Sequence, residues 1–401
     1  MYNFSSKTFN QYEVKKGNKS LVLEAIKNYS PISRASIAER TQLNKGTVSS
    51  LVNELVEDKI VTETGPGQSS GGRRPIMLLF NSNAGYSIGI DIGVNYLLGI
   101  LTNLNGEILT EKKITLNDHD FKNVMAQVRS IVDHLKTSIQ PTPYGLVGIG
   151  VGVPGVVHKN GTVLLAPNLG WSNAPLKEHM ESTFKVPVTI ENEANAGAYG
   201  EKIYGVGKGH DNIAYISAGI GIGVGLIING QLYKGDNGFS GEMGHMTIEL
   251  DGKLCRCGNR GCWELYASEQ TIIEKAMESG ISKEEATLEN LTHLAEQGNA
   301  MANQIFSDIG ELLGIGITNI INTFNPEQII IGNRLAMANN WIKPSLDRKL
   351  KHNLLSFFHD DLSLQFSTLN SYSASLGVSA FTIENFLMIS LTNGTNMTFG
   401  W

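Results

Sequence analysis

The sequence predicts a winged helix-turn-helix at the N-terminus, followed by an α/β domain of two lobes that contains a structural metal site. Three short amphipathic segments and two strands fill the first 80 residues. A pattern of strand, glycine turn and strand occurs in each half of the remainder, and all three cysteines lie between residues 255 and 262. We expect domains at residues 1–82, 83–190 and 191–373, with a helix at 374–390 that returns to complete the first lobe.

Length and composition are typical of a soluble protein with more than one domain. The chain has 401 residues, of which 41% are hydrophobic and 17% charged. Its N-terminus has no signal-peptide pattern, and the most apolar stretch, 146–157, is interrupted by glycines and Pro154, which predicts a buried strand rather than a membrane span. Three cysteines cannot all pair, so we expect reduced, metal-bound thiols in a cytoplasmic, nucleoid-associated protein.

The net charge of −6 is unevenly distributed. Residues 1–80 carry 11 lysines and arginines against 7 aspartates and glutamates, a net charge of +4, which leaves −10 on the remainder. A basic module joined to an acidic body is typical of a DNA-binding module fused to a small-molecule-binding module.

The first 60 residues predict three helices in succession. Ser33 is the expected N-cap of the second helix and Asn44 of the third. In the third helix one apolar face is formed by Val48, Leu51, Val52 and Leu55. The other faces are small or polar and suit a helix in the major groove of DNA, and they present Lys45, Thr47, Ser49, Ser50 and Asn53. The alternative is an ordinary helical hairpin with a solvated face.

Two strands, at 60–64 and 75–80, follow these helices and predict the wing. Their connection contains Gly72-Arg73-Arg74-Pro75, which resembles arginine hooks that enter narrow, A·T-rich minor grooves. We expect DNA contacts from Ser70, Gly72, Arg73 and Arg74. A glycine loop with two arginines is also compatible with a flexible, solvated tip, but the preceding helices favour DNA contact.

The body contains an internal repeat of the pattern strand, glycine turn, strand. Residues 86–95 run into a strand at 97–102 and a turn at Asn105-Gly106, and residues 214–223 run into a strand at 224–228 and a turn at Asn229-Gly230. Asn-Gly favours a type I′ hairpin turn. Two such hairpins indicate duplicated lobes around a cleft, as in the actin-like sugar kinases, where glycine turns approach the phosphates of a nucleotide.

The cysteines predict a zinc site. His245, Cys255, Cys257 and Cys262 supply three thiolates and one imidazole, which complete a tetrahedral zinc shell with no open position, so we expect structural Zn²⁺. Glu242 and Glu264 flank these ligands and indicate that the metal supports a site for polar ligands. Alternatively, both glutamates are surface residues or only support the metal ligands.

Several motifs carry a resemblance to a known family. They are the turn Asp91-Ile92-Gly93, Gly152-Val153-Pro154-Gly155, Pro167-Asn168-Leu169-Gly170-Trp171, Glu191-Asn192-Glu193-Ala194-Asn195, Glu242-Met243-Gly244-His245, the cysteine cluster, and Asn325-Pro326-Glu327-Gln328-Ile329-Ile330-Ile331-Gly332. With them the chain resembles the ROK family (repressors, open reading frames and kinases), which implies ribonuclease H-like lobes. The N-terminal module resembles that of the family's transcriptional branch. Within this branch, residues 191–246 are most similar to xylose-responsive repressors of Gram-positive bacteria.

The resemblance implies a sugar site between the lobes. Carried over by motif, its residues are Asn192, Glu193, Glu242, His245 and Glu264, with Asn168 as a further candidate. Carboxylates offer acceptors to vicinal hydroxyls, and an amide both donates and accepts. A metal-bound histidine has a second ring nitrogen for a ligand hydroxyl.

Three departures from the family's kinases predict that the chain is not an enzyme. The kinases' Asp-x-Gly-Gly-Thr turn is here Asp91-Ile92-Gly93-Val94-Asn95, with a β-branched valine that tolerates positive φ poorly. Glu193 stands where the resemblance places the catalytic aspartate, and an error of about 1 Å in a reacting group costs on the order of 10²-fold in rate. A paired glycine has become Gly332-Asn333.

The sequence therefore predicts a sugar-responsive repressor. We expect a homodimer, or a dimer of dimers, on a palindromic, A/T-rich double-stranded operator, with xylose or a glucose-like monosaccharide as effector and no membrane partner. Release of DNA by the sugar follows from the resemblance alone. The alternatives are an ATP-dependent ROK sugar kinase that also binds DNA, and a zinc-stabilised interaction protein without a ligand.

Overall fold

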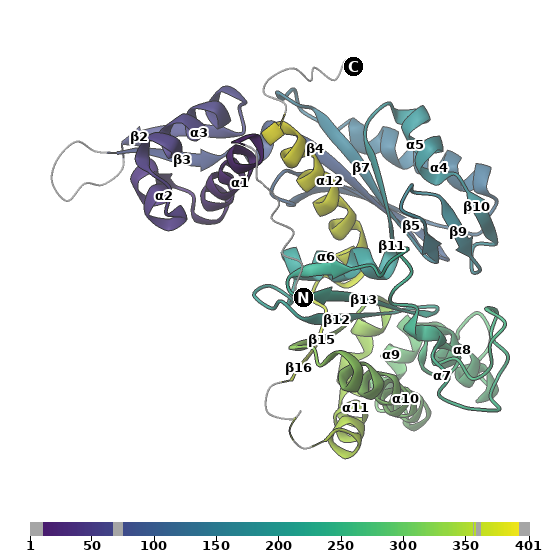
Figure 1. The fold of residues 1–401 in the computed structure, drawn as a ribbon. Helices are drawn as coiled ribbons and strands as arrows, with labels where there is room; N and C mark the ends of the chain where they lie inside the picture. Colours follow the sequence, from purple (N-terminus) through teal and green to yellow (C-terminus); the bar gives the residue numbers. More distant parts are fainter. Residues whose placement is uncertain (1–10, 67–74, 356, 358–361, 393–401) are drawn as a thin grey trace, which may run out of the picture.

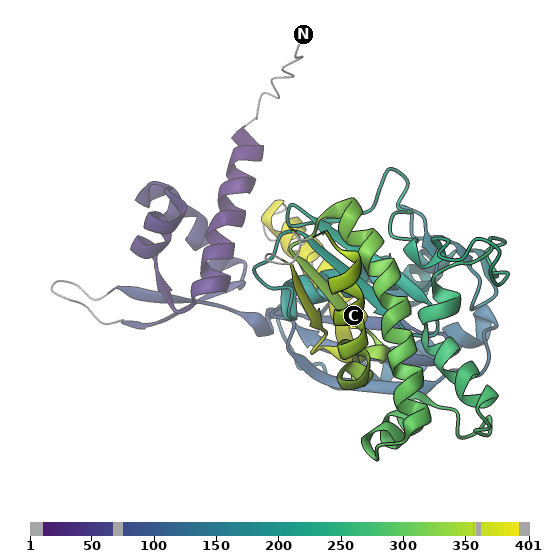
Figure 2. The same ribbon diagram turned by 90° about the horizontal axis from the view of Figure 1, so that it is seen from below.

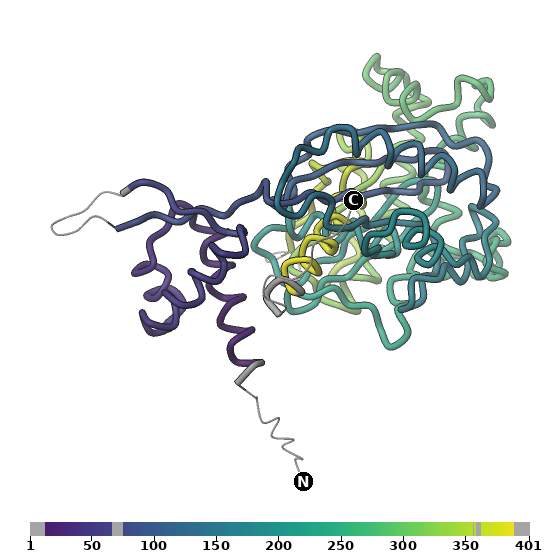
Figure 3. The backbone as a smooth tube through the Cα atoms, turned by 90° about the horizontal axis from the view of Figure 1, so that it is seen from above, coloured from purple at the N-terminus to yellow at the C-terminus, as the bar shows by residue number. Residues whose placement is uncertain are grey.

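A computed structural model describes residues 11–66, 75–355, 357 and 362–392 (Figure 1). Its N-terminal unit contains helices α1 (Gln11–Tyr29), α2 (Arg34–Thr41) and α3 (Lys45–Glu57). Strands β1 (Ile32–Ser33), β3 (Ile76–Phe80) and β2 (Val61–Pro66) form an antiparallel sheet in that order. The unit lies at one side of the body, which it contacts through α1 and α12, and its β2–β3 hairpin extends away from the body (Figures 2 and 3). Ser70, Gly72, Arg73 and Arg74 lie outside the described residues.

Both predicted helix caps are confirmed. Ser33 Oγ accepts a hydrogen bond from the Ser36 amide at 3.1 Å, and Asn44 Oδ1 accepts one from the Thr47 amide at 2.8 Å. The apolar face predicted for α3 is buried against α1 and α2, in a core that includes Ile26 and Ile37. Local capping and helical periodicity therefore define this unit.

The first lobe is built on a five-stranded sheet in the order β11-β7-β4-β5-β6. Strands β4 (Tyr86–Ile92), β7 (Leu146–Val153) and β11 (Val188–Asn192) are parallel, and β5 (Tyr96–Asn103) and β6 (Ile108–Thr115) continue antiparallel from β4. Helix α4 (Phe121–Lys136) packs on one face and α5 (Leu176–Phe184) packs on β11. A small sheet of β8 (Val156–Val157), β9 (Val163–Ala166) and β10 (Trp171–Ala174) extends toward the second lobe.

The second lobe repeats this plan. Its sheet has the order β14-β13-β12-β15-β16, formed by β12 (Ile213–Ala218), β13 (Ile222–Ile228), β14 (Gln231–Tyr233), β15 (Gln328–Gly332) and β16 (Ser363–Phe366). Helix α6 (Glu193–Tyr204) packs on β12 and β13. The other helices are α7 (Glu264–Ala267), α8 (Glu269–Glu278), α9 (Leu288–Glu296), α10 (Ala300–Phe324) and α11 (Asn339–Asn353), with short 3₁₀ turns at η1 (Ser82–Ala84), η2 (Met243–His245), η3 (Arg334–Ala338) and η5 (Asn370–Tyr372).

The last helix, α12 (Ser373–Thr392), returns to the first lobe and packs on β4 and β7. Glycines in these strands allow a close approach, since a Cβ atom at Gly89 would lie 2.1 Å from the Ser375 carbonyl oxygen and one at Gly150 2.3 Å from that of Val378. None of the described helices has the length and hydropathy needed to cross a membrane.

The duplicated hairpins are present as β4–β5 and β12–β13, but their ends differ. At Asn229-Gly230 both residues have positive φ, 51° and 76°, which confirms the predicted type I′ turn. The same prediction is wrong at Asn105-Gly106, where only Gly106 has a positive φ. There the Gly106 amide bonds back to the Asn103 carbonyl at 3.0 Å, and a register shift between Leu101 and Thr102 lengthens the connection.

Candidate functional site

A cavity of about 300 Å³ lies between the two lobes. The first lobe contributes the β4–β5 turn, the residues after β7 and the β9–β10 turn. The second lobe contributes the β12–β13 turn, η2 and the cysteine loop. The glycine turns of both hairpins therefore face one cavity, whose volume is in the range of small-molecule sites.

The structure brings the six residues predicted to contact a ligand into the wall of this cavity. They are Asn168, Asn192, Glu193, Glu242, His245 and Glu264. Asn168 comes from the β9–β10 turn of the first lobe, and Glu242 and His245 come from η2 of the second lobe and the residue before it. Carboxylates, amides and an imidazole converge there, a combination of donors and acceptors that suits vicinal hydroxyls.

Asn192 is already engaged as the N-cap of α6. Its Oδ1 accepts hydrogen bonds from the Ala194 and Asn195 amides at 2.9 and 3.1 Å, and its Nδ2 donates to the Gly155 carbonyl at 2.8 Å. The side chain thus ties the start of α6 to the first lobe and directs Glu193, the first residue of α6, into the cavity.

Glu193 is held toward the second lobe. Its Oε1 accepts hydrogen bonds from Ser217 Oγ and from Asn333 Nδ2, both at 2.8 Å. Burial raises the pKa of Glu193, although these two hydrogen bonds favour the ionised form. The sequence identified Asn333 only as a departure from a glycine pair, and no pattern marked Ser217.

Asp91, next to the last residue of β4, is buried. The Tyr96 hydroxyl donates to Asp91 Oδ2 at 2.6 Å, and burial, together with the charge of Glu193, raises the pKa of Asp91 well above its usual range. The Tyr96 ring lies so close to Gly93 that a Cβ atom at Gly93 would be 2.4 Å from it. Val94 lies outside the left-handed region, so the valine is accommodated in this turn, which the Gly93 amide closes by donating to the Tyr96 carbonyl at 2.9 Å.

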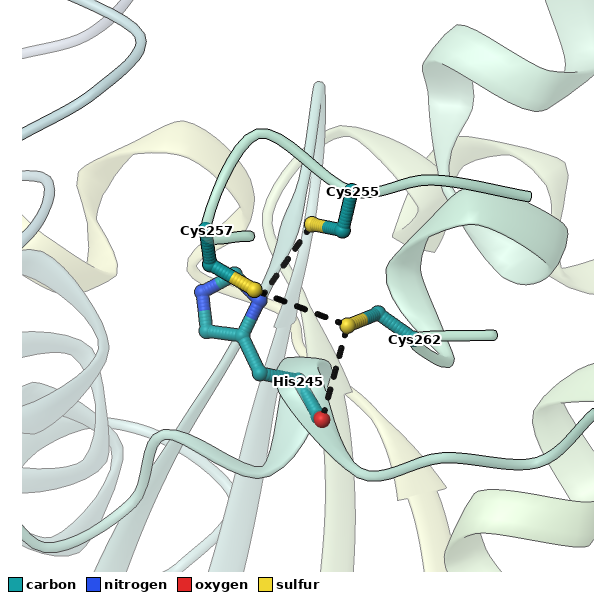
Figure 4. A group of neighbouring side chains, drawn as sticks. All are labelled: His245, Cys255, Cys257 and Cys262. Carbon is teal, nitrogen blue, oxygen red and sulfur yellow. Dashed lines mark hydrogen bonds between the residues drawn. The ribbon is translucent and has the colours of Figure 1, made fainter. Parts of the chain in front are cut away.

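The four predicted metal ligands form one cluster (Figure 4). Their ligand atoms all lie within 4.8 Å of one another, with 3.7 Å between Cys255 Sγ and His245 Nδ1 and 3.7 Å between Cys257 Sγ and Cys262 Sγ. A tetrahedral zinc with bonds of about 2.3 Å to sulfur requires sulfur atoms about 3.8 Å apart, so this donor set fits the ion. The three cysteines form no disulfide bond. Gly258 and Gly261 have positive φ angles of 93° and 71°, which allow the tight turns of the cysteine loop.

Arg256 is a cavity residue that sequence reasoning missed. It stands between two predicted metal ligands, and its Nη1 donates to Asn168 Oδ1 at 3.0 Å, so the cysteine loop of the second lobe touches the first lobe. Glu264 also approaches the cluster, with Oε1 at 3.3 Å from His245 Nδ1 and accepting from Cys255 Sγ at 3.1 Å. The only sequence feature that could have identified Arg256 as a cavity residue is its position inside the cysteine motif.

The polar face predicted for α3 is accessible. Lys45, Ser50 and Asn53 are exposed, and Thr47 and Ser49 are half-buried. Arg34, at the start of α2, was not predicted to take part, yet its Nη2 donates to Asn53 Oδ1 at 3.0 Å and to Glu63 Oε1 at 2.8 Å. This cation therefore adjoins the polar face of α3 and is fixed by β2.

Family comparison agrees with this architecture. The chain matches the ROK family over residues 87–385, and it belongs to this family. A solved ROK family transcriptional regulator, described as a homologue of E. coli MLC, has a TM-score of 0.80 and 27% identity and covers 94% of this chain and 99% of its own. A ROK glucokinase from Streptomyces griseus, solved with glucose and AMPPNP, has a TM-score of 0.68 and 27% identity over 74% of this chain and 99% of its own.

Among curated relatives, the chain is similar to the xylose repressor of Bacillus subtilis (strain 168). The two sequences are 46% identical over 374 residues, which cover 93% of this chain and 97% of the relative. A protein named putative xylose repressor from Caldicellulosiruptor sp. (strain Rt8B.4) is 40% identical over 93% of this chain and 97% of its own length.

Proposed function

We propose that this chain is a sugar-responsive transcriptional repressor, which binds operator DNA through its N-terminal unit and releases it when a monosaccharide occupies the interlobe cavity. The observation that carries the proposal is the convergence of six polar residues on one cavity in a chain that also presents the accessible polar face of α3. Xylose is the proposed effector because the relatives that share 40–46% identity are named for it.

The N-terminal unit, within residues 1–82, acts in this proposal as a winged helix-turn-helix. Helix α3 reads a major groove through Lys45, Ser50 and Asn53, Thr47 and Ser49 flank them, and the wing with Arg73 and Arg74 enters the minor groove. A homodimer on a palindromic, A/T-rich operator supplies two such heads, with half-sites about 34 Å apart or a multiple of that distance. The basic charge of this unit supports contact with phosphates.

The cavity residues act as sugar contacts in the lobes at 83–190 and 191–373. Glu193, Glu242 and Glu264 accept from sugar hydroxyls, and Asn168 and Asn192 present amides. A structural Zn²⁺ would be held by His245, Cys255, Cys257 and Cys262, where it fixes the cysteine loop. His245 turns Nδ1 toward Cys255, which leaves Nε2 on the side of Glu242, 3.9 Å from Oε2.

Binding without phosphoryl transfer is the chemistry that these contacts support. The Tyr96 ring packs against Gly93 in the first hairpin turn, and Asn333 Nδ2 would lie 3.0 Å from a Cβ atom at Gly219 in the second. Both turns are therefore crowded by side chains where the family's kinases accommodate phosphates. Glu193, at the position of the kinase aspartate, is engaged by Ser217 and Asn333.

The test is release of DNA. The protein and its own promoter DNA are mixed at fixed salt, a panel of monosaccharides is titrated, and binding is followed by fluorescence anisotropy. Release by one sugar in the absence of ATP, xylose being expected, supports the proposal. If no sugar changes binding while one of them is phosphorylated when ATP is added, the chain is a sugar kinase and the proposal is wrong.

A further inference from the structure

Helix α12 contacts α6, the first lobe and α1, and in Figure 1 it extends from α6 at one end toward α1 at the other. Near its C-terminal end Ile383, Phe386 and Leu387 are buried in one hydrophobic core with Val22 and Ile26 of α1. A displacement of α12 therefore displaces the surface on which the N-terminal unit rests.

At the other end, α12 and α6 are fixed to each other through their backbones. A Cβ atom at Gly377 would lie 1.8 Å from the Ala196 carbonyl oxygen, and one at Gly200 would lie 2.1 Å from that of Ser373. Helix α6 begins with Glu193 in the cavity wall, so the packed pair of helices extends from the cavity to the N-terminal unit.

A second route starts at the loop that carries Glu242. The Ser240 amide bonds to the Lys234 carbonyl at 3.2 Å, and both Ser240 and Glu242 line the cavity. The Lys234 ammonium forms an ion pair with the buried carboxylate of Glu191, and it also lies 5.4 Å above the centroid of the Phe381 ring of α12. Lys234 does not line the cavity, yet it joins a cavity loop to α12.

From Phe381 the contacts continue toward α1. The Phe381 ring stacks on Tyr199 of α6 with 4.1 Å between centroids and 9° between planes. The Tyr199 hydroxyl donates to Glu384 Oε1 at 2.5 Å. Burial raises the pKa of Glu384, while the charge of Lys27 on α1 favours its ionised form. Glu384 follows Ile383 and precedes Phe386 on α12, and both of these residues are buried in the core shared with α1, so the contacts end at the N-terminal unit.

We propose that this chain of side chains, from Lys234 through Phe381 and Tyr199 to Glu384, couples the sugar cavity to the N-terminal unit. The inference rests on the proposed function and names its route of regulation. Sugar contact at Glu242 shifts the loop that ends at Lys234, and α12 transmits the shift to α1. None of the four residues lines the cavity, so all four are positioning residues.

The test separates coupling from binding. Lys234→Met removes the charge and keeps the length of the side chain, and Tyr199→Phe removes one hydroxyl and keeps the stacked ring. Lys283→Met is the matched control, since Lys283 is an exposed lysine in the connection between α8 and α9. For each protein, affinity for promoter DNA is measured by anisotropy with and without saturating xylose, and affinity for xylose alone by calorimetry.

We expect both variants to retain the two separate affinities within about twofold, while the ratio of DNA affinities without and with xylose falls by about 3- to 30-fold. The double variant should lose no more than the more affected single variant, because the residues act in one chain. Lys283→Met should behave as the wild type.

The inference would be overturned if both variants kept the wild-type ratio of DNA affinities without and with xylose. It would also be overturned if this ratio fell and the affinity for xylose in the absence of DNA fell by the same factor. Glu384→Gln provides a third variant if Tyr199→Phe is unstable. Absence of any sugar response in the wild-type protein would instead contradict the proposed function itself.

Discussion

Asn192 links the two lobes at the cavity, and its replacement has an effect that can be worked from the structure. Asn192→Ala removes the N-cap of α6, which costs about 1 kcal/mol, and the bond to the Gly155 carbonyl, which costs about 1 kcal/mol more. Asn192→Ser keeps a capping oxygen but is too short to reach Gly155. The free energy of unfolding should therefore fall by about 2 kcal/mol for alanine and about 1 kcal/mol for serine.

Thermal unfolding followed by tryptophan fluorescence measures this difference, because Trp171, Trp263 and Trp341 lie in the body and the N-terminal unit has no tryptophan. We expect midpoints lowered by roughly 4 °C for Asn192→Ala and roughly 2 °C for Asn192→Ser. Affinity for the sugar should fall in the same order, since α6 positions Glu193. Equal midpoints for the two variants would refute the separate role of the bond to Gly155, and a wild-type midpoint for Asn192→Ala would refute both contributions.

Three further predictions concern the metal, the buried carboxylates and the wing. Cys257→Ser should lose bound zinc by metal analysis, unfold at a lower temperature and no longer respond to sugar; a zinc-free variant with full stability and response would contradict a structural role. Glu193→Gln should become more stable relative to the wild type as the pH rises from about 5 to about 8. Burial raises the pKa of Glu193, so the wild-type protein loses stability as this carboxyl ionises, whereas glutamine does not ionise. A difference in unfolding midpoint that stays constant over this range would contradict the burial argument. Replacing Arg73 and Arg74 by alanine should weaken DNA binding and flatten its dependence on salt by about 0.9 in log–log slope for each phosphate that the wing no longer neutralises; an unchanged slope would exclude an interaction between the wing and phosphates.

Features that depend on neighbouring residues could be predicted from the sequence. The caps at Ser33 and Asn44 and the buried face of α3 follow from short-range hydrogen bonding and helical periodicity, and all three are confirmed. The metal cluster could also be predicted from the sequence, since Cys255, Cys257 and Cys262 lie so close in sequence that a tight loop brings their sulfur atoms together.

Contacts that no motif marks and that depend on the surrounding fold could not be predicted. The prediction of a type I′ turn at Asn105-Gly106 was wrong because the register shift between β5 and β6 leaves a longer connection than a two-residue turn spans. The hydrogen bond from Asn333 to Glu193 joins residues 140 positions apart, and that from Arg256 to Asn168 joins residues 88 apart. No local pattern encodes either bond.

Sequence motifs mark the cavity and the N-terminal unit, which are the two ends of the regulatory route, but they do not mark the residues between them. Glu242 and the helix after Asn44 belong to segments with recognisable patterns, whereas Phe381 and Glu384 lie in an apolar helix whose sequence has no feature that marks a partner. Their role depends on Tyr199 and Lys234, which the fold places beside them from the second lobe. A sensor and a kinase that share these lobes can therefore have similar cavities and still differ in function, because the response to the sugar depends on what α12 contacts at its far end.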